Sequence, residues 1–152
     1  MMSRLIRALT RNQAQTHPAA RDPRLRGRRY AIPFDRVWNV ATLLADQGLP
    51  GWRVTSWNDR EGLIKAEARA GVFRWTDEVT IRITLDENAQ TRVDLTSRSK
   101  VGKADFGMNA RRIETFLREL DQRLEAAPDE ILETSAGRPQ RSGSSSSIGL
   151  RA

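Results

Sequence analysis

The feature that most constrains the fold of this chain is a stretch of strand-like sequence over residues 52–97. Apolar and polar residues alternate there, most clearly at residues 79–85, where every odd position is apolar. Turn residues, such as those at 58–62, separate one run from the next, and such short connections join antiparallel neighbours. We therefore expect four antiparallel strands: Trp52–Trp57, Leu63–Ala70, Val72–Leu85 and Thr91–Ser97.

Two helices and one further strand flank these four strands. A short strand is expected at residues 30–32, and apolar residues at a period of about 3.6 predict a helix over residues 35–48. A second helix is expected from Phe106 or Asn109 to Ala126, with one apolar stripe that suits the inner face of a sheet. The stripe consists of Ile113, Phe116, Leu117, Leu120 and Leu124. The order β-α-β-β-β-β-α predicts an α+β fold, a two-layer sandwich in which two helices cover one face of an antiparallel sheet of about five strands.

The chain divides by composition into three parts. Residues 1–29 are basic and contain two prolines, so we expect a largely disordered tail, with a short amphipathic helix at residues 2–11 as the one candidate element. Residues 30–127 form the single α+β domain for which a chain of 152 residues has room. Residues 128–152 are rich in Ser and Gly and are expected to be disordered.

The formal charge of +7 is concentrated in the two tails. Residues 1–29 carry eight Arg and one Asp, a net +7, and residues 136–152 carry three Arg, a net +3. Residues 30–135 carry fifteen Lys and Arg against eighteen Asp and Glu, a net −3. The folded part is therefore mildly acidic, which disfavours a basic groove for nucleic acid within it. Nucleic-acid binding by the tails is also disfavoured, because only Tyr30, at the border, adds an aromatic ring to their arginines.

The chain lacks residues that several classes of functional site require. There is no cysteine, which removes disulfides, thiolate nucleophiles and the usual zinc and iron–sulfur sites. The single histidine, His17, lies in the predicted tail, so we expect neither a Ser–His system nor a histidine-based metal site. No apolar run approaches the roughly 20 residues of a membrane-spanning helix. We expect a cytoplasmic protein without metal or cofactor, and residues 2–11 leave attachment to the surface of the inner membrane as an alternative.

Residues 96–113 are the one segment that hydrophobic periodicity and turn chemistry do not explain. They combine hydroxyl groups, glycines and cations at the start of the last helix, where free backbone N–H groups attract anions. One hypothesis is an anion-binding site, which would consist of Arg98, Lys100, Lys103, Asn109 and Arg112. The alternative is structural: Asp105 pairs with Arg98 or Arg112 in a clasp that fixes the connection between strand and helix. Of the two, the clasp is favoured.

The same segment resembles the hallmark of a family of bacterial and plastid proteins, domain of unknown function family 1499. Residues 97–109 read Ser-Arg-Ser-Lys-Val-Gly-Lys-Ala-Asp-Phe-Gly-Met-Asn and are followed by Arg112 and Ile113. The family pattern is Arg-Ser-x-Ser-Arg-x-Gly-x-x-Asp-x-Gly-x-Asn-x-x-Arg-Ile. Thr96 and Lys100 depart from it conservatively.

Two further matches extend this resemblance along the chain. Residues 32–38 read Ile-Pro-x-x-x-Val-Trp, and residues 73–79 read Phe-x-Trp-x-Asp-Glu-Val, as expected in the family. The resemblance therefore spans about residues 30–124. It implies no reaction, cofactor or catalytic residue, because none is established for the family.

Three functions remain open from the sequence. The leading hypothesis is a non-catalytic domain that binds a small anionic or amphipathic ligand, or a protein partner, at the predicted anion site. The first alternative is a peripheral membrane-associated protein held by residues 2–11 and by the Arg-rich tail. The second is a hydrolase whose metal is bound by carboxylates, centred on Asp77, Glu78 or Asp105. Neighbouring residues of a strand point to opposite faces, which weakens a site built on Asp77 and Glu78 together.

Overall fold

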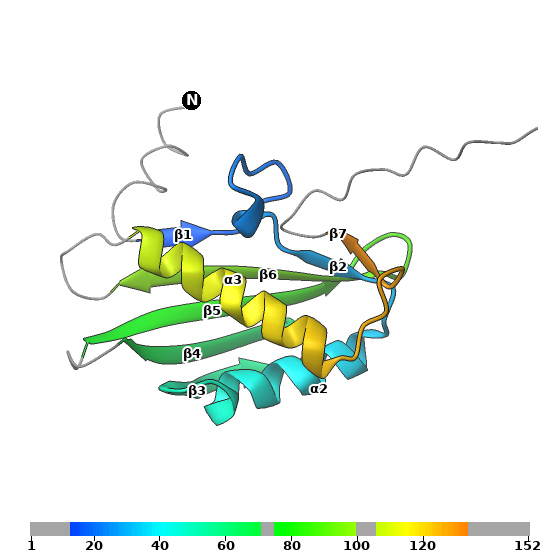
Figure 1. Cartoon of the computed structure of the whole chain (residues 1–152). Coiled ribbons are helices and arrows are strands. Elements are labelled where there is room, and N and C mark those ends of the chain that lie inside the picture. The colour runs from blue at the N-terminus through cyan, green and yellow to red at the C-terminus, as the bar shows by residue number, and fades with distance from the viewer. Residues whose placement is uncertain (1–12, 71–74, 100–105, 134–152) are drawn as a thin grey trace, which may run out of the picture.

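The four expected strands are consecutive neighbours in an antiparallel sheet, and the first of them lies at its edge (Figure 1). The computed structural model describes residues 13–70, 75–99 and 106–133. The four strands are β3 Trp52–Asn58, β4 Leu63–Ala70, β5 Trp75–Leu85 and β6 Thr91–Ser99, which pair in sequence order. The predicted start of the third strand at Val72 lies outside the described residues.

Three short strands extend the sheet beyond β6, so that it has seven strands and not about five. β1 Gln13–Gln15 pairs with residues 96–98 of β6, and β2 Arg28–Tyr30 pairs with residues 91–93 along the same edge. β7 Ile131–Glu133 pairs with the other side of β2. The order across the sheet is β3-β4-β5-β6-β2-β7, with β1 beside β6. The predicted element order therefore lacked the first and the last strand.

The predicted start of the domain at residue 30 is wrong, because residues 13–29 belong to the fold. Ala14 and Leu25 are buried in the core, at 0% and 2% exposure. The segment looked like a linker because its apolar residues are few, but these few pack inside the domain. β7 likewise occupies residues that were predicted to be disordered. The predicted helix at residues 2–11 and the tail at 134–152 lie outside the described residues.

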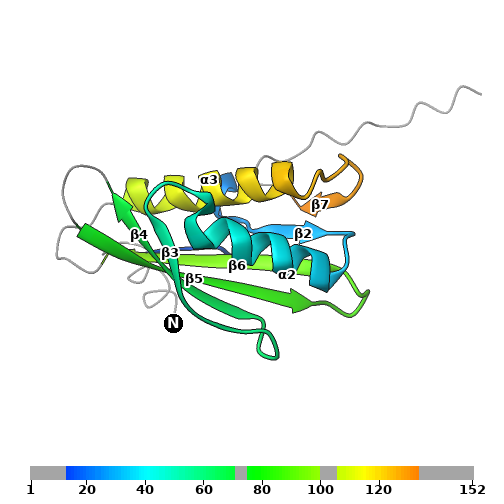
Figure 2. The same ribbon diagram turned by 90° about the horizontal axis from the view of Figure 1, so that it is seen from below.

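Two helices lie on the same side of the sheet (Figure 2). α2 Phe34–Leu43 continues into the π-helical turn η2 Leu44–Gly48, and α3 spans Phe106–Arg123. All five residues of the predicted stripe of the last helix are fully buried. Trp52 on β3 stacks against Phe116 on α3, with ring centroids 5.2 Å apart. An α+β fold with an antiparallel sheet and two helices is therefore confirmed. No helix in the described ranges is long and apolar enough to cross a membrane.

The alternation along β4, β5 and β6 divides their residues between two faces. Inner positions lie under the helices and are buried, as Ile64, Ile81 and Leu95 are. Outer positions are mostly polar and are exposed or half-buried. No helix of the described residues covers this outer face (Figure 2). The sheet therefore presents an open polar surface on the side away from the core.

Gly62 closes the turn between β3 and β4 in the left-handed region, with a φ of 64°. Its carbonyl accepts a hydrogen bond from the Ile83 N–H at 2.8 Å, and a Cβ at Gly62 would clash with the Ile83 carbonyl oxygen. We expect Gly62→Ala to lower the free energy of unfolding by about 2 kcal/mol, because the backbone conformation and the clash both disfavour a side chain. Urea denaturation measures the change. Glu61→Ala, at an exposed neighbour, is the control, and an equal loss in both variants would contradict this account.

Candidate functional site

Arg112 on α3 is the centre of a buried polar cluster between this helix and the sheet. Its Nη1 lies 2.7 Å from Oδ2 of Asp77 on β5, and both side chains are less than a tenth exposed. The same nitrogen donates to Oγ of Ser97 on β6 at 3.1 Å and to Oδ1 of Asn109 at 2.9 Å. Asn109 also accepts a hydrogen bond from Ser97 and donates one to Ser99. We call these five residues the Arg112 cluster.

The Arg112 cluster acts as a clasp, because it ties α3 to β5 and β6. Within the described residues, the acid that pairs with Arg112 is Asp77, which the sequence suggested only for a metal site. Asp105, Lys100 and Lys103 lie outside the described residues, so their predicted roles stay predictions. No buried side-chain nitrogen or oxygen in the described ranges lacks a hydrogen-bond partner. The guanidinium of Arg112 is therefore engaged within the fold, which leaves it poorly placed to bind an external anion.

Arg98 is separated from the Arg112 cluster by the sheet. Its neighbour Ser97 is fully buried on the inner face, whereas Arg98 itself is exposed. Successive residues of a strand point to opposite faces, so Arg98 belongs to the outer face. Of the predicted anion site, the described residues Asn109 and Arg112 thus lie on one side of the sheet and Arg98 lies on the other. These three side chains do not converge on one ligand.

The same alternation separates the two carboxylates proposed for a metal. Asp77 contacts Arg112 on the inner face, and Glu78 lies opposite Arg98 on the outer face. Among the residues that the structure describes, no group of three or more His, Cys, Asp and Glu is placed to hold a metal ion. The geometry of these residues therefore gives no support to a carboxylate-bound metal.

A second buried polar cluster anchors β2 to α3. Arg28 donates from Nε and Nη2 to the two carboxylate oxygens of Asp121, at 3.0 and 2.9 Å. The hydroxyl of Tyr30 donates to Oδ1 of the same Asp121 at 2.6 Å. Burial and, after it, the adjacent Asp121 carboxylate raise the pKa of Tyr30 well above its usual range, so the hydroxyl remains a donor. An arginine of the predicted linker is thus part of the interior.

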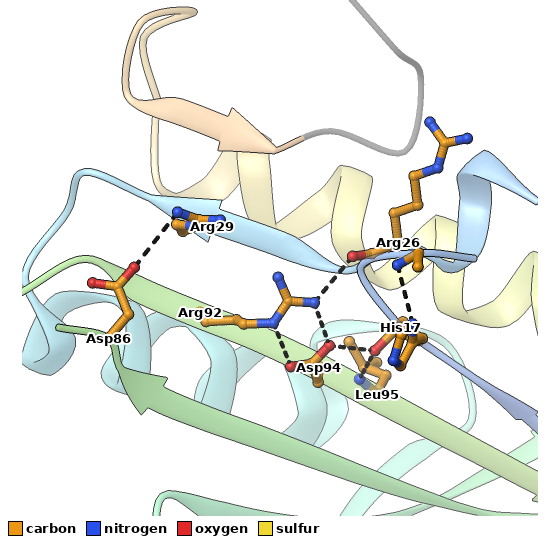
Figure 3. A network of polar contacts seen from close by, with 9 residues as sticks. His17, Arg26, Arg29, Asp86, Arg92, Asp94 and Leu95 are labelled. Atoms are coloured by element: carbon orange, nitrogen blue, oxygen red, sulfur yellow. Dashed lines mark hydrogen bonds and ion pairs between the residues drawn. The ribbon is translucent and has the colours of Figure 1, made fainter. Parts of the chain in front are cut away.

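Two further arginines, Arg29 on β2 and Arg92 on β6, form ion pairs with nearby aspartates (Figure 3). Arg92 donates to the two carboxylate oxygens of Asp94 at 2.8 and 2.9 Å, and it also donates to the carbonyl oxygen of Arg26 at 3.1 Å. Arg29 lies 3.7 Å from Asp86. These contacts compensate the charge of Arg29 and Arg92 locally.

Four exposed cations of the outer face differ from these arginines. They are Lys65, Arg69, Arg82 and Arg98, on β4, β5 and β6. Their side chains have no ion-pair or hydrogen-bond partner in the described part of the chain. Arg53 on β3, by contrast, pairs with Glu67 at 2.9 Å. Arg82 and Arg98 lie opposite Asp94 and Glu78 across the sheet, but neither is held in an ion pair within the described residues, and cations outnumber acids on the outer face.

The outer positions of β3 to β6 differ in net charge from the rest of the described residues. The outer positions of β3 to β6 carry six Lys and Arg against three Asp and Glu, a net +3. The described residues together carry seventeen Lys and Arg against eighteen Asp and Glu, a net −1, so the remainder is net −4. We call the outer surface of β3 to β6 the basic face. Its charged residues are Arg53, Lys65, Glu67, Arg69, Glu78, Arg82, Arg92, Asp94 and Arg98.

Of the unpartnered cations on the basic face, only Arg98 was predicted as a site residue. Lys65 and Arg69 alternate with buried alanines on β4, and Arg82 lies between the buried Ile81 and Ile83 on β5. The period of two that identified the strands would also have placed these cations on one surface. The signal was therefore present in the sequence.

Comparison with known proteins identifies a family for this architecture. A family model described as "Protein of unknown function (DUF1499)" matches residues 8–120. No curated protein matches the chain. The matched range contains the strands of the basic face and the whole Arg112 cluster.

Proposed function

Since the chain belongs to the DUF1499 family of proteins of unknown function, no activity can be carried over to it, and we propose from its own residues that the domain is a non-catalytic binding module for an anionic partner. The observation that carries the proposal is the basic face, with a net +3 on a described domain of net −1. The match confirms the resemblance seen in the sequence. The charge and the exposure of these residues support this binding surface.

Four cations that have no partner among the described residues supply the binding energy in this proposal. A surface lysine or arginine that has an acidic neighbour contributes little net field, because the pair is nearly neutral. Lys65, Arg69, Arg82 and Arg98 stand on one surface, and none of them is held in an ion pair within the described residues, although Arg82 and Arg98 lie opposite Asp94 and Glu78. Their summed field raises the local concentration of anions and speeds association at low ionic strength. Of the predicted anion site, the proposal retains Arg98. It omits Arg112, because that residue forms an ion pair with Asp77.

The proposal predicts which arginines control binding to a polyanion. We expect wild-type protein to bind heparin with a steep salt dependence, and the triple variant Arg69→Gln/Arg82→Gln/Arg98→Gln to bind more weakly. The slope of log affinity against log salt should fall in magnitude by about two to three, because fewer counterions are released. Fluorescence titration at several salt concentrations measures the slope.

A matched triple variant shows whether position or net charge is responsible. Arg60, Arg111 and Arg118 are also exposed, lie off the basic face, and have no side-chain partner in the described part of the chain. Arg60→Gln/Arg111→Gln/Arg118→Gln removes the same charge and should bind heparin as the wild type does. If the two triple variants lose affinity equally, the basic face is not the binding surface.

A further inference from the structure

We infer that the domain has a second binding site, for a small organic cation, in a hollow between the start of α2 and the turn that joins β3 to β4. The hollow has a volume of about 520 Å³, which lies within the range of small-molecule sites. Its lining consists of Phe34, Asp35, Trp38, Asn39, Asp59 and Arg60. None of these residues belongs to the basic face, so the site is separate from the function proposed above.

Two aromatic rings on successive turns of α2 contribute to the lining. The rings of Phe34 and Trp38 stack, with centroids 5.8 Å apart and an angle of 15° between their planes. An ammonium group within about 6 Å of such a ring is attracted to its face, and an apolar body packs against the ring surface. The stacked pair therefore suits an organic cation better than a bare metal ion.

The indole N–H of Trp38 is a hydrogen-bond donor that the fold does not use. Trp38 is only 9% exposed, and its Nε1 has no hydrogen-bond partner in the described part of the chain. Every fully buried side-chain nitrogen of the described residues has such a partner, so this N–H must reach the small exposed part of Trp38, which borders the hollow. A buried tryptophan usually finds an acceptor for this group. An oxygen atom of a ligand in the hollow would supply that acceptor.

Two carboxylates, against one arginine, give the lining a net charge of −1. Asp35 and Asp59 are exposed, and neither side chain has an ion-pair or hydrogen-bond partner among the described residues. Asp35 lies in the first turn of α2, where the helix dipole favours an acid even without a ligand. The carboxylate of Asp59 has no such role, because the side chain that accepts hydrogen bonds from the backbone of the turn is that of Asn58. Asp59 therefore makes the hollow selective for a cation.

These groups together define the chemistry of the ligand. The carboxylates bind an ammonium group, the stacked rings contact an apolar or aromatic body, and the N–H of Trp38 donates to an oxygen atom. The net charge of the lining disfavours an anion, which distinguishes the hollow from the basic face. The ligand is therefore an amine whose apolar body carries a hydrogen-bond acceptor, and tyramine is a simple probe of this class.

Titration of the full chain with tyramine, followed by heteronuclear NMR of the indole N–H groups, tests this assignment. We expect a saturable shift of the Trp38 resonance, while the resonance of the buried Trp52, which is not part of the lining, stays in place. Para-ethylphenol lacks the ammonium group and phenethylamine lacks the oxygen atom, so each should bind more weakly than tyramine. Hydroxyphenylpropionate carries the opposite charge and should not shift the Trp38 resonance.

A pair of double variants shows whether the carboxylates of the hollow select the ligand. Asp35→Asn/Asp59→Asn should weaken tyramine binding about tenfold, because two exposed carboxylates lose their charge. Glu114→Gln/Glu119→Gln removes the same charge from α3, outside the lining, and should bind tyramine as the wild type does. If the two double variants lose affinity equally, the carboxylates of the hollow do not hold the cation and the assignment is wrong.

The ligand series gives further results that would overturn the assignment. No shift of the Trp38 resonance by tyramine would mean that the hollow does not bind this class of ligand. If hydroxyphenylpropionate, para-ethylphenol or phenethylamine binds as tightly as tyramine, the charge or the acceptor does not select the ligand. If tetralysine shifts the Trp38 resonance at a lower concentration than tyramine does, the occupant is a basic segment of a protein and not a small molecule. Heparin binding tests the basic face and is independent of all these results.

Discussion

Replacing Arg112 with methionine is expected to lower the free energy of unfolding by about 3–5 kcal/mol, because it leaves the buried carboxylate of Asp77 without its cation. The Asp77 side chain is 8% exposed, so water cannot replace the lost partner. Ser97 and Asn109 each lose one hydrogen bond from the same guanidinium. Chemical denaturation followed by tryptophan fluorescence measures the loss.

Two further variants show whether the unpaired charge is the cause. Arg111→Met changes the neighbouring arginine on α3, which is exposed, and should alter stability by less than about 0.5 kcal/mol. Asp77→Val combined with Arg112→Met removes the whole ion pair, and apolar replacements of such pairs are often neutral or stabilising. The double variant should therefore recover most of the stability that Arg112→Met loses. If it is as unstable as the single variant, the loss comes from packing and not from the buried carboxylate.

The four long strands, β3 to β6, could be predicted because their alternation is local information. Each of β3 to β6 is long enough to show the pattern, and their short connections fix the antiparallel pairing. β1 and β7 have three residues each, too few for a periodicity, and they exist because β6 and β2 offer free edges. Edge pairing of this kind depends on the folded sheet. It could not be derived from the residues Gln-Ala-Gln alone.

The ion pair of Arg112 shows a different limit of prediction from sequence. Sequence proximity pointed to Asp105 as the acid, but the acid in contact is Asp77, on another strand. Asp77 has the same parity as Val79, Ile81 and Ile83, so its place on the inner face followed from the alternation. A buried aspartate needs a cation, and this reasoning would have narrowed the candidates. Which arginine pairs with Asp77 is decided by the way in which α3 packs on the sheet.

The basic face shows that net charge per segment does not describe a surface. Residues 30–135 are net acidic, which by itself disfavours a basic groove within them. A strand sends alternate residues to opposite faces, so one segment contributes to surfaces of different charge. The outer face of β3 to β6 is net positive although the described domain is not. A count of the charges at alternate positions of each predicted strand would have revealed this positive face.

Asp121→Ala is expected to lower the free energy of unfolding by about 3–5 kcal/mol, because this one carboxylate holds two buried partners from β2. It leaves the guanidinium of Arg28, which is 6% exposed, without its bidentate acceptor. It also removes the acceptor of the Tyr30 hydroxyl. Since β2 lies between β6 and β7, loss of this anchor weakens that end of the sheet. Thermal and urea denaturation report the change.

Tyr30→Phe and Glu119→Ala divide this effect into its parts. Tyr30→Phe removes one hydrogen bond to a charged group and should cost about 1.5–3 kcal/mol, less than Asp121→Ala, since the Arg28 pair remains. Glu119→Ala removes a half-exposed acid of the same helix that has no side-chain partner in the described part of the chain, and it should change stability by less than about 0.5 kcal/mol. A loss in Asp121→Ala no larger than that in Tyr30→Phe would mean that Arg28 finds water when its partner is removed. In that case the anchor of β2 would be the hydrogen bond of Tyr30 and not the ion pair.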